Sequence, residues 1–235
     1  MPPAMKAAPR PRPSVGEEEA LWARGLRFVA GIDEVGRGPL AGPIVAAAVV
    51  LDPDRLPGWV GDVRDSKQLP AGERERLANA IRSEALAFGL GSASVTEIDV
   101  WGIAPANRVA MSRAITALRL QPHFVLVDGR SRLCIPQPQR TIIDGDALCV
   151  SIAAASIVAK VARDSLMRDL DGLYPGYGFA SNKGYGTPGH LASLAACGPS
   201  EQHRRSFEPV RRAAQATEAA RRATVRKALV GDAEG

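Results

Sequence analysis

Residues 31–43 read Gly-Ile-Asp-Glu-Val-Gly-Arg-Gly-Pro-Leu-Ala-Gly-Pro, a pair of acids followed by a glycine-rich turn. Asp33 and Glu34 end an apolar run that begins at Phe28 and predicts a buried strand. Adjacent carboxylates raise each other's pKa unless a cation compensates them, and oxygen ligands favour Mg²⁺ or Mn²⁺. The stretch therefore predicts a metal-binding strand end, although a surface acid pair before an ordinary turn is the alternative.

The turn that follows has the composition of an anion-binding loop. Gly36 and Gly38 let backbone N–H groups approach an anionic ligand closely, and Arg37 adds a forked donor suited to phosphate. The loop and the acids together indicate chemistry on a phosphate-bearing substrate.

The pattern of apolar residues predicts an α/β fold with a mixed sheet. Strands are expected at 27–33, 44–51, 87–95, 123–128 and 139–144. Helices are expected at 73–86, at 147–171, at 188–198 and beyond Pro209, and a further helix is expected to open with a capping box at Thr96–Asp99, restart at Pro105 and continue through Leu118. Three strands in succession, followed by strands that alternate with helices, favour one α/β layer structure.

Composition divides the 235 residues into three segments. Residues 1–27 are Pro-rich and then acidic, which predicts a flexible extension, and residues 28–208 form one large domain. Residues 209–235 are expected to be a basic helical segment or tail. Eight of the 30 Lys and Arg residues lie within 204–227 beside only two acids. That excess suits contact with a polyanion, but a solvated helix face is equally compatible.

Nothing in the sequence predicts secretion or membrane insertion. The N-terminal segment lacks an apolar signal region, and no apolar run is long enough to span a bilayer. Cys134, Cys149 and Cys197 have unrelated spacings that predict reduced thiols rather than disulfides or a zinc site. We expect a soluble cytoplasmic monomer.

Further acids occupy positions where they could join the first pair. Asp128 ends a predicted strand, as Asp33 does, and parallel neighbouring strands would bring both to one edge of the sheet. Asp146 precedes the long helix and could join them, with Asp144 as a second candidate. Four oxygen donors suit two-metal hydrolysis of a phosphodiester. An ordinary turn at Asp128 and a helix N-cap at Asp146 are the alternatives.

These stretches also resemble a known family. Gly31-Ile-Asp-Glu-Val-Gly-Arg-Gly38 is similar to the opening motif of bacterial ribonuclease HII. The likeness continues in the family's order through Asp65-Ser-Lys-Gln-Leu69, Val127-Asp-Gly129, Gly145-Asp146, Ala154-Ala-Ser-Ile-Val-Ala-Lys-Val-Ala-Arg-Asp164, Lys183-Gly-Tyr-Gly-Thr187 and His203-Arg-Arg-Ser-Phe207. The resemblance implies a ribonuclease H-like fold: a five-stranded mixed sheet flanked by helices, with a helical C-terminal extension. Its first three strands would be antiparallel, and two more would be parallel to the first.

The resemblance assigns roles to individual residues. The implied catalytic residues and ligands for two Mg²⁺ or Mn²⁺ ions are Asp33, Glu34, Asp128 and Asp146. The implied substrate-binding residues are Gly36, Arg37, Gly38, Ser66, Lys67 and Tyr185. The chain departs from the family pattern at Asp144, where a non-acidic residue is common, and at Asn182, where histidine is usual.

The implied activity is endonucleolytic. We expect hydrolysis of the RNA strand of RNA–DNA hybrids, and incision 5′ of single ribonucleotides in duplex DNA with 5′-phosphate and 3′-hydroxyl products. Two alternatives stay open, a ribonuclease HIII-type enzyme and a non-catalytic nucleic-acid-binding protein. Residues 1–27 are too short for the folded N-terminal domain of the HIII type, and no serine is set up with histidine and aspartate as a nucleophile.

Overall fold

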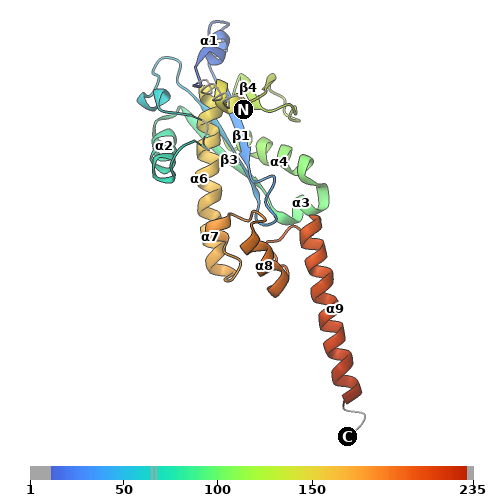
Figure 1. The fold of residues 1–235 in the computed structure, drawn as a ribbon. Helices are drawn as coiled ribbons and strands as arrows, with labels where there is room; N and C mark the ends of the chain where they lie inside the picture. The colour runs from blue at the N-terminus through green and yellow to red at the C-terminus, as the bar shows by residue number, and fades with distance from the viewer. Residues whose placement is uncertain (1–11, 65, 67, 232–235) are drawn as a thin grey trace, which may run out of the picture. The chain divides into compact units, whose positions relative to one another are not determined.

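The computed structural model describes residues 12–64, 66 and 68–231, with side chains to residue 223, and these residues contain a five-stranded mixed sheet (Figure 1). Its strands are β1 (Val29–Val35), β2 (Ile44–Val50), β3 (Ala87–Ala93), β4 (Phe124–Asp128) and β5 (Gln139–Ile142). They lie in the order β3-β2-β1-β4-β5. β1 pairs antiparallel with β2 and parallel with β4, and β4 pairs parallel with β5. The predicted fold class is confirmed.

Helices precede, connect and follow these strands along the chain (Figure 1). They are α1 (Gly16–Trp22), η1 (Gly58–Gly61), α2 (Ala71–Glu84), α3 (Val95–Trp101), α4 (Ile103–Thr116), α5 (Gly145–Leu148), α6 (Val150–Leu173), α7 (Phe179–Asn182), α8 (Pro188–Cys197) and α9 (Glu208–Gly231). None of the helices within the described residues is long and apolar enough to cross a membrane.

The described residues fall into two compact units. The first contains 12–35, 45–91 and 110–161, and the second contains 36–44, 92–109 and 162–231. The first unit holds most of the sheet, and the second holds the glycine-rich loop and the C-terminal helices.

In the first unit, helices cover both faces of the sheet. Ala47, Val49 and Leu51 form one buried cluster with apolar residues of α2 and the first half of α6. Phe88 of β3 packs against the same cluster, so the alternate residues Gly89 and Gly91 face the opposite side. There α4 approaches so closely that a Cβ on either glycine would lie 2.2 Å from a carbonyl oxygen of α4.

Another close helix–strand approach lies at Gly31 of β1. A Cβ there would lie 2.3 Å from Ser151 Oγ and 2.4 Å from the Ile152 amide nitrogen of α6. Small residues on α6 make this approach possible, because Ala153, Ala154 and Ala155 are fully buried against the cluster.

Helix α1 was not among the expected elements. It lies within the segment predicted to be a flexible extension, but Leu21 is packed in the core and Glu18 is buried. The Glu18 carboxylate accepts hydrogen bonds from the Ser151 amide (2.8 Å) and hydroxyl (2.6 Å). Glu18 therefore satisfies an otherwise unpaired N–H in the first turn of α6, a contact between residues 133 positions apart that no local pattern predicts.

Two predicted helix starts were wrong. The capping box is formed by Ser94 and Glu97 at the start of α3, whereas Asp99 accepts hydrogen bonds from the Ser206 amide and hydroxyl and from the Arg205 amide. The helix expected at 147–171 is divided at Cys149, whose extended backbone separates α5 from α6. Asp146 therefore lies inside α5 and is not an N-cap.

A buried histidine pair anchors the second unit. Ser200 N–H donates to His203 Nδ1, so the proton of neutral His203 sits on Nε2 and is donated to His190 Nε2 at 3.0 Å. His190 Nδ1 then donates to the Tyr185 carbonyl at 2.8 Å. Burial, together with His190, lowers the pKa of His203 to about 4. The network gives both histidines a structural role.

Gly31→Ala is expected to destabilise the protein by about 1–3 kcal/mol or more, because the added methyl overlaps the α6 backbone. The matched control is Gly72→Ala near the start of α2, where a Cβ meets nothing within 4 Å. That change is expected to stabilise by about 0.5–1 kcal/mol. Urea unfolding of both variants measures the difference, and equal stabilities would contradict the close approach at Gly31.

The depressed pKa of His203 predicts acid-sensitive stability. Between its ordinary pKa of about 6.5 and its folded pKa of about 4, His203 binds a proton in the unfolded chain but not in the folded chain. The free energy of unfolding therefore falls as the pH drops towards 4. In His203→Gln this contribution is absent. The stability difference between wild type and variant should therefore shrink between pH 7 and pH 4.5 in urea titrations. A difference independent of pH would show that His203 titrates normally.

Candidate active site

Asp33 and Asp128 lie side by side on neighbouring strands of the first unit. The parallel register pairs Ile32 of β1 with Val127 of β4, so these two acids are the next residues along each strand. Because successive strand residues point to opposite faces, Asp33 lies on the same sheet face as Val29, and Asp128 on the same face as Leu126. Val29 and Leu126 pack with Ile152 of α6 on that face. The expected meeting of the two strand ends is present in the structure.

The electrostatics of the two carboxylates reflect this closeness. Burial first, and then Glu34 and Asp128, raise the pKa of Asp33 well above its usual value, and its side chain is only 6% exposed. Burial and the charge of Asp146 raise the pKa of Asp128 to about 6, against a hydrogen bond from the Gly145 amide at 2.7 Å. The four predicted ligands therefore form one electrostatically linked group.

The side chains of the four predicted ligands do not form a coordination shell in this structure. Within the described part of the chain, no three acidic, histidine or cysteine side chains are arranged so that they could hold a metal ion. One reason is that consecutive strand residues point to opposite faces, which directs Glu34 away from Asp33. Asp144 is exposed and has a left-handed backbone with φ 54°.

A pair of serines supports Asp33 from α6 and from the 65–69 motif. Ser156 hydrogen bonds to the Asp33 carboxylate, and its hydroxyl lies 3.0 Å from Ser66 Oγ. Ser66 is buried, so the structure places this predicted substrate-binding residue beneath the carboxylate. Lys67, the other prediction from this motif, lies outside the described residues.

The glycine-rich loop belongs to the second unit and is held by Arg204. This guanidinium is fully buried and donates to the carbonyl oxygens of Gly36, Arg37 and Gly42. Arg37 itself is exposed, as is Gly38. The sequence reasoning counted Arg204 in a basic surface segment, and its burial corrects that assignment.

Tyr185 is 43% exposed beside this loop, where a Cβ on Gly38 would lie 3.7 Å from its ring. The turn that carries Tyr185 is shaped by Asn182, which accepts from the Gly184 amide and donates to the Tyr177 carbonyl. Asn182 therefore has a local structural role in this chain.

Comparisons with known proteins agree on one family. A family model described as Ribonuclease HII matches residues 30–210. The chain is 53% identical over 195 residues to Ribonuclease HII of Desulfitobacterium hafniense strain Y51, covering 83% of this chain and 74% of that protein. It is 50% identical over 199 residues to Ribonuclease HII of Dehalococcoides mccartyi, covering 85% and 94%. The crystal structure of ribonuclease H2 from Pyrococcus horikoshii aligns with a TM-score of 0.69 at 27% identity, covering 80% of this chain and 97% of that one.

The chain belongs to the ribonuclease HII family. It is accordingly a hydrolase and an endoribonuclease of the ribonuclease H type. The residues that match the family model lie in both compact units.

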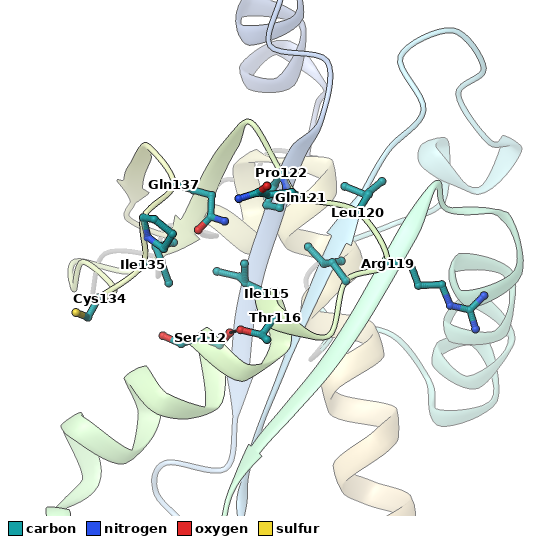
Figure 2. Close-up of a pocket in the computed structure, with 12 residues that line it drawn as sticks. Ser112, Ile115, Thr116, Arg119, Leu120, Gln121, Pro122, Cys134, Ile135 and Gln137 are labelled. Atoms are coloured by element: carbon teal, nitrogen blue, oxygen red, sulfur yellow. Dashed lines mark hydrogen bonds between the residues drawn. The ribbon is translucent and has the colours of Figure 1, made fainter.

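A separate pocket of the first unit contains none of the predicted ribonuclease HII site residues. Its volume is about 500 Å³, and it lies among the end of α4, the loop after it and the loop before β5 (Figure 2). Its lining is mainly aliphatic and amide, with the Arg119 side chain pointing away from the others (Figure 2). The carboxylates of the four predicted ligands, and not the residues that line this pocket, provide the ionisable groups suited to hydrolysis.

Proposed function

We propose that this ribonuclease H hydrolyses the RNA strand of RNA–DNA hybrids and incises duplex DNA 5′ of a single ribonucleotide. The juxtaposition of Asp33 and Asp128 at two parallel strand ends carries the proposal. Burial raises the pKa of both carboxylates, Asp128 further raises that of Asp33, and Asp146 raises that of Asp128, so a divalent cation would relieve the repulsion within this group. Family membership supplies the class of substrate.

The carboxylates fit a magnesium or manganese site by their chemistry. Asp33, Glu34, Asp128 and Asp146 offer only oxygen donors, which Mg²⁺ and Mn²⁺ prefer. When bound, such ions supply activation of water and stabilisation of the leaving oxygen. The carboxylates would have to move closer together to hold an ion. Ser156 orients Asp33, and the Gly145 amide orients Asp128, before that change.

A purely nucleic-acid-binding role is less compatible with these residues. Uncompensated carboxylates repel phosphate unless cations intervene. The C-terminal basic excess is also smaller than its residue count indicates, because Arg204 is buried and Arg212 and Arg222 pair with Glu208 and Glu218. We propose that the remaining charge of α9 assists duplex binding but does not carry the function.

Ribonucleotide selection is assigned to the Gly36–Gly38 loop and Tyr185. A protein distinguishes RNA from DNA at one nucleotide through the 2′-hydroxyl, which donates and accepts a hydrogen bond. The loop begins two residues after Glu34 and exposes Arg37 and Gly38. Tyr185 presents an exposed ring that can stack on the next deoxyribose, where a further 2′-hydroxyl would crowd it. This arrangement demands ribose on one side of the phosphate and deoxyribose on the other.

Asp33→Asn, Glu34→Gln and Asp128→Asn are each expected to lower cleavage by roughly a hundredfold or more, because each removes a negatively charged oxygen from the group. Asp146→Asn should also be strongly impaired, and Asp144→Asn is the matched control, expected to have a mild effect. Steady-state cleavage with Mg²⁺ or Mn²⁺, together with duplex binding in filter assays, checks this. A larger loss from Asp144→Asn than from Asp146→Asn would disprove the choice of fourth ligand.

The substrate proposal is tested on end-labelled duplex DNA that contains one ribonucleotide, with and without Mg²⁺ or Mn²⁺. We expect metal-dependent incision on the 5′ side of the ribonucleotide, with 3′-hydroxyl and 5′-phosphate ends. Tyr185→Ala should lower cleavage there by about tenfold or more while duplex binding changes less, since one stacking contact is lost. Equal cutting of an all-DNA duplex by the wild type is the result that would refute the proposal.

A further inference from the structure

Two loops of the second unit meet around the buried side chain of Arg163. Its Nε donates to the Pro43 carbonyl (3.0 Å), its Nη2 to the Ala41 carbonyl (3.1 Å) and its Nη1 to the Lys183 carbonyl (2.9 Å). The first two oxygens belong to the loop that begins at Gly36, and the third belongs to the turn that carries Tyr185. One guanidinium therefore joins the two segments assigned to substrate selection.

The burial of Arg163 is unusual for a charged side chain. It is 0% exposed, and burial lowers its pKa. The described residues provide it with three backbone carbonyl groups and no ion pair. A buried cation is costly unless its donors are satisfied, so these carbonyl oxygens hold Arg163 and are held by it in turn. The planar, forked guanidinium fixes the separation and orientation of all three.

Contacts around Arg163 show how closely the loops fit. Gly36 has φ +98°, and a Cβ there would lie 2.3 Å from Arg163 Nε. The Leu40 amide donates to the Gly184 carbonyl at 2.8 Å, and a Cβ on Gly184 would lie 2.4 Å from the Ala41 oxygen. The spacing between the Gly36–Pro43 loop and Tyr185 therefore leaves little room for adjustment.

We propose that Arg163 is a positioning residue for substrate selection, setting the distance between the Gly36–Gly38 loop and Tyr185. It touches no substrate and acts through the backbone of both segments. This inference rests on the proposed function, in which the loop accepts a ribose and Tyr185 stacks on the following deoxyribose. A preference for a ribose–deoxyribose junction requires both elements at a defined spacing, whereas a continuous hybrid offers ribose at every position of one strand.

The test compares Arg163→Met with Arg168→Met, which changes an exposed arginine of the same helix and serves as control. For each protein, kcat/KM is measured on duplex DNA with one ribonucleotide and on a continuous RNA–DNA hybrid. Arg163→Met should lower the junction-to-hybrid ratio by about tenfold, because a small misplacement of a binding group is costly in rate. Arg168→Met should leave the ratio unchanged. Circular dichroism and the thermal midpoint monitor folding.

A double-mutant cycle separates this inference from the proposed function. If Arg163 acts by placing Tyr185, then Arg163→Met added to Tyr185→Ala should lower the ratio no further. A reduced ratio in Tyr185→Ala with an unchanged ratio in folded Arg163→Met would overturn the role of Arg163 alone. An unchanged ratio in Tyr185→Ala would overturn the proposed stacking and this inference together.

Arg163→Lys keeps the test decisive if Arg163→Met fails to fold. Lysine retains the charge but replaces the planar fork with a single ammonium group, so it cannot hold three carbonyl oxygens in the same geometry. We expect a folded variant with a junction-to-hybrid ratio between those of wild type and Tyr185→Ala. A folded Arg163→Lys protein with the wild-type ratio would contradict the inference.

Discussion

The backbone of α6 passes so close to β1 that only glycine fits at position 31, and much of the first unit follows from this approach. It requires the small buried residues of α6 and places Ser156 beside Asp33. The groups that act on the Asp33 carboxylate are thus a serine hydroxyl, a backbone amide and two further carboxylates. No cationic side chain of the described residues is among the groups that shift the pKa of this buried carboxylate, and an uncompensated carboxylate favours a bound metal ion.

Among the described residues of the second unit, the buried charges are positive rather than negative. Arg163 and Arg204 are fully buried cations whose guanidinium groups donate hydrogen bonds to backbone carbonyl oxygens of the Gly36–Pro43 loop and of Lys183. These carbonyl groups turn towards the guanidinium groups, and loop side chains such as Arg37 remain exposed. The arginines therefore hold irregular backbone in one conformation without using carboxylates, which would compete with a phosphate-bearing ligand for positive charge.

The candidate site was predictable to the extent that it depends on strand ends. Asp33 and Asp128 follow apolar runs, and parallel strands bring their carboxyl ends to one edge. Arg163 and Arg204 escaped prediction because their partners are carbonyl oxygens about 120 and 160 residues away in sequence. No side-chain pattern marks such partners. Ser66 was expected to bind substrate, and its burial was not predicted because the burial of a loop serine depends on the helix that packs over it.

By itself, the sequence determined the α/β class, the order of the strands along the chain, the acids at two strand ends and the likeness to ribonuclease HII. These features depend on local periodicity and on motifs whose residues are contiguous. Only the tertiary structure decided that Glu18 of α1 caps α6 and that Cys149 separates α5 from α6. It also decided that Arg163 and Arg204 hold the loop that begins at Gly36 through hydrogen bonds to its carbonyl oxygens. Each of these depends on hydrogen bonds between distant segments, and a polar group acquires such a partner only when packing removes it from water.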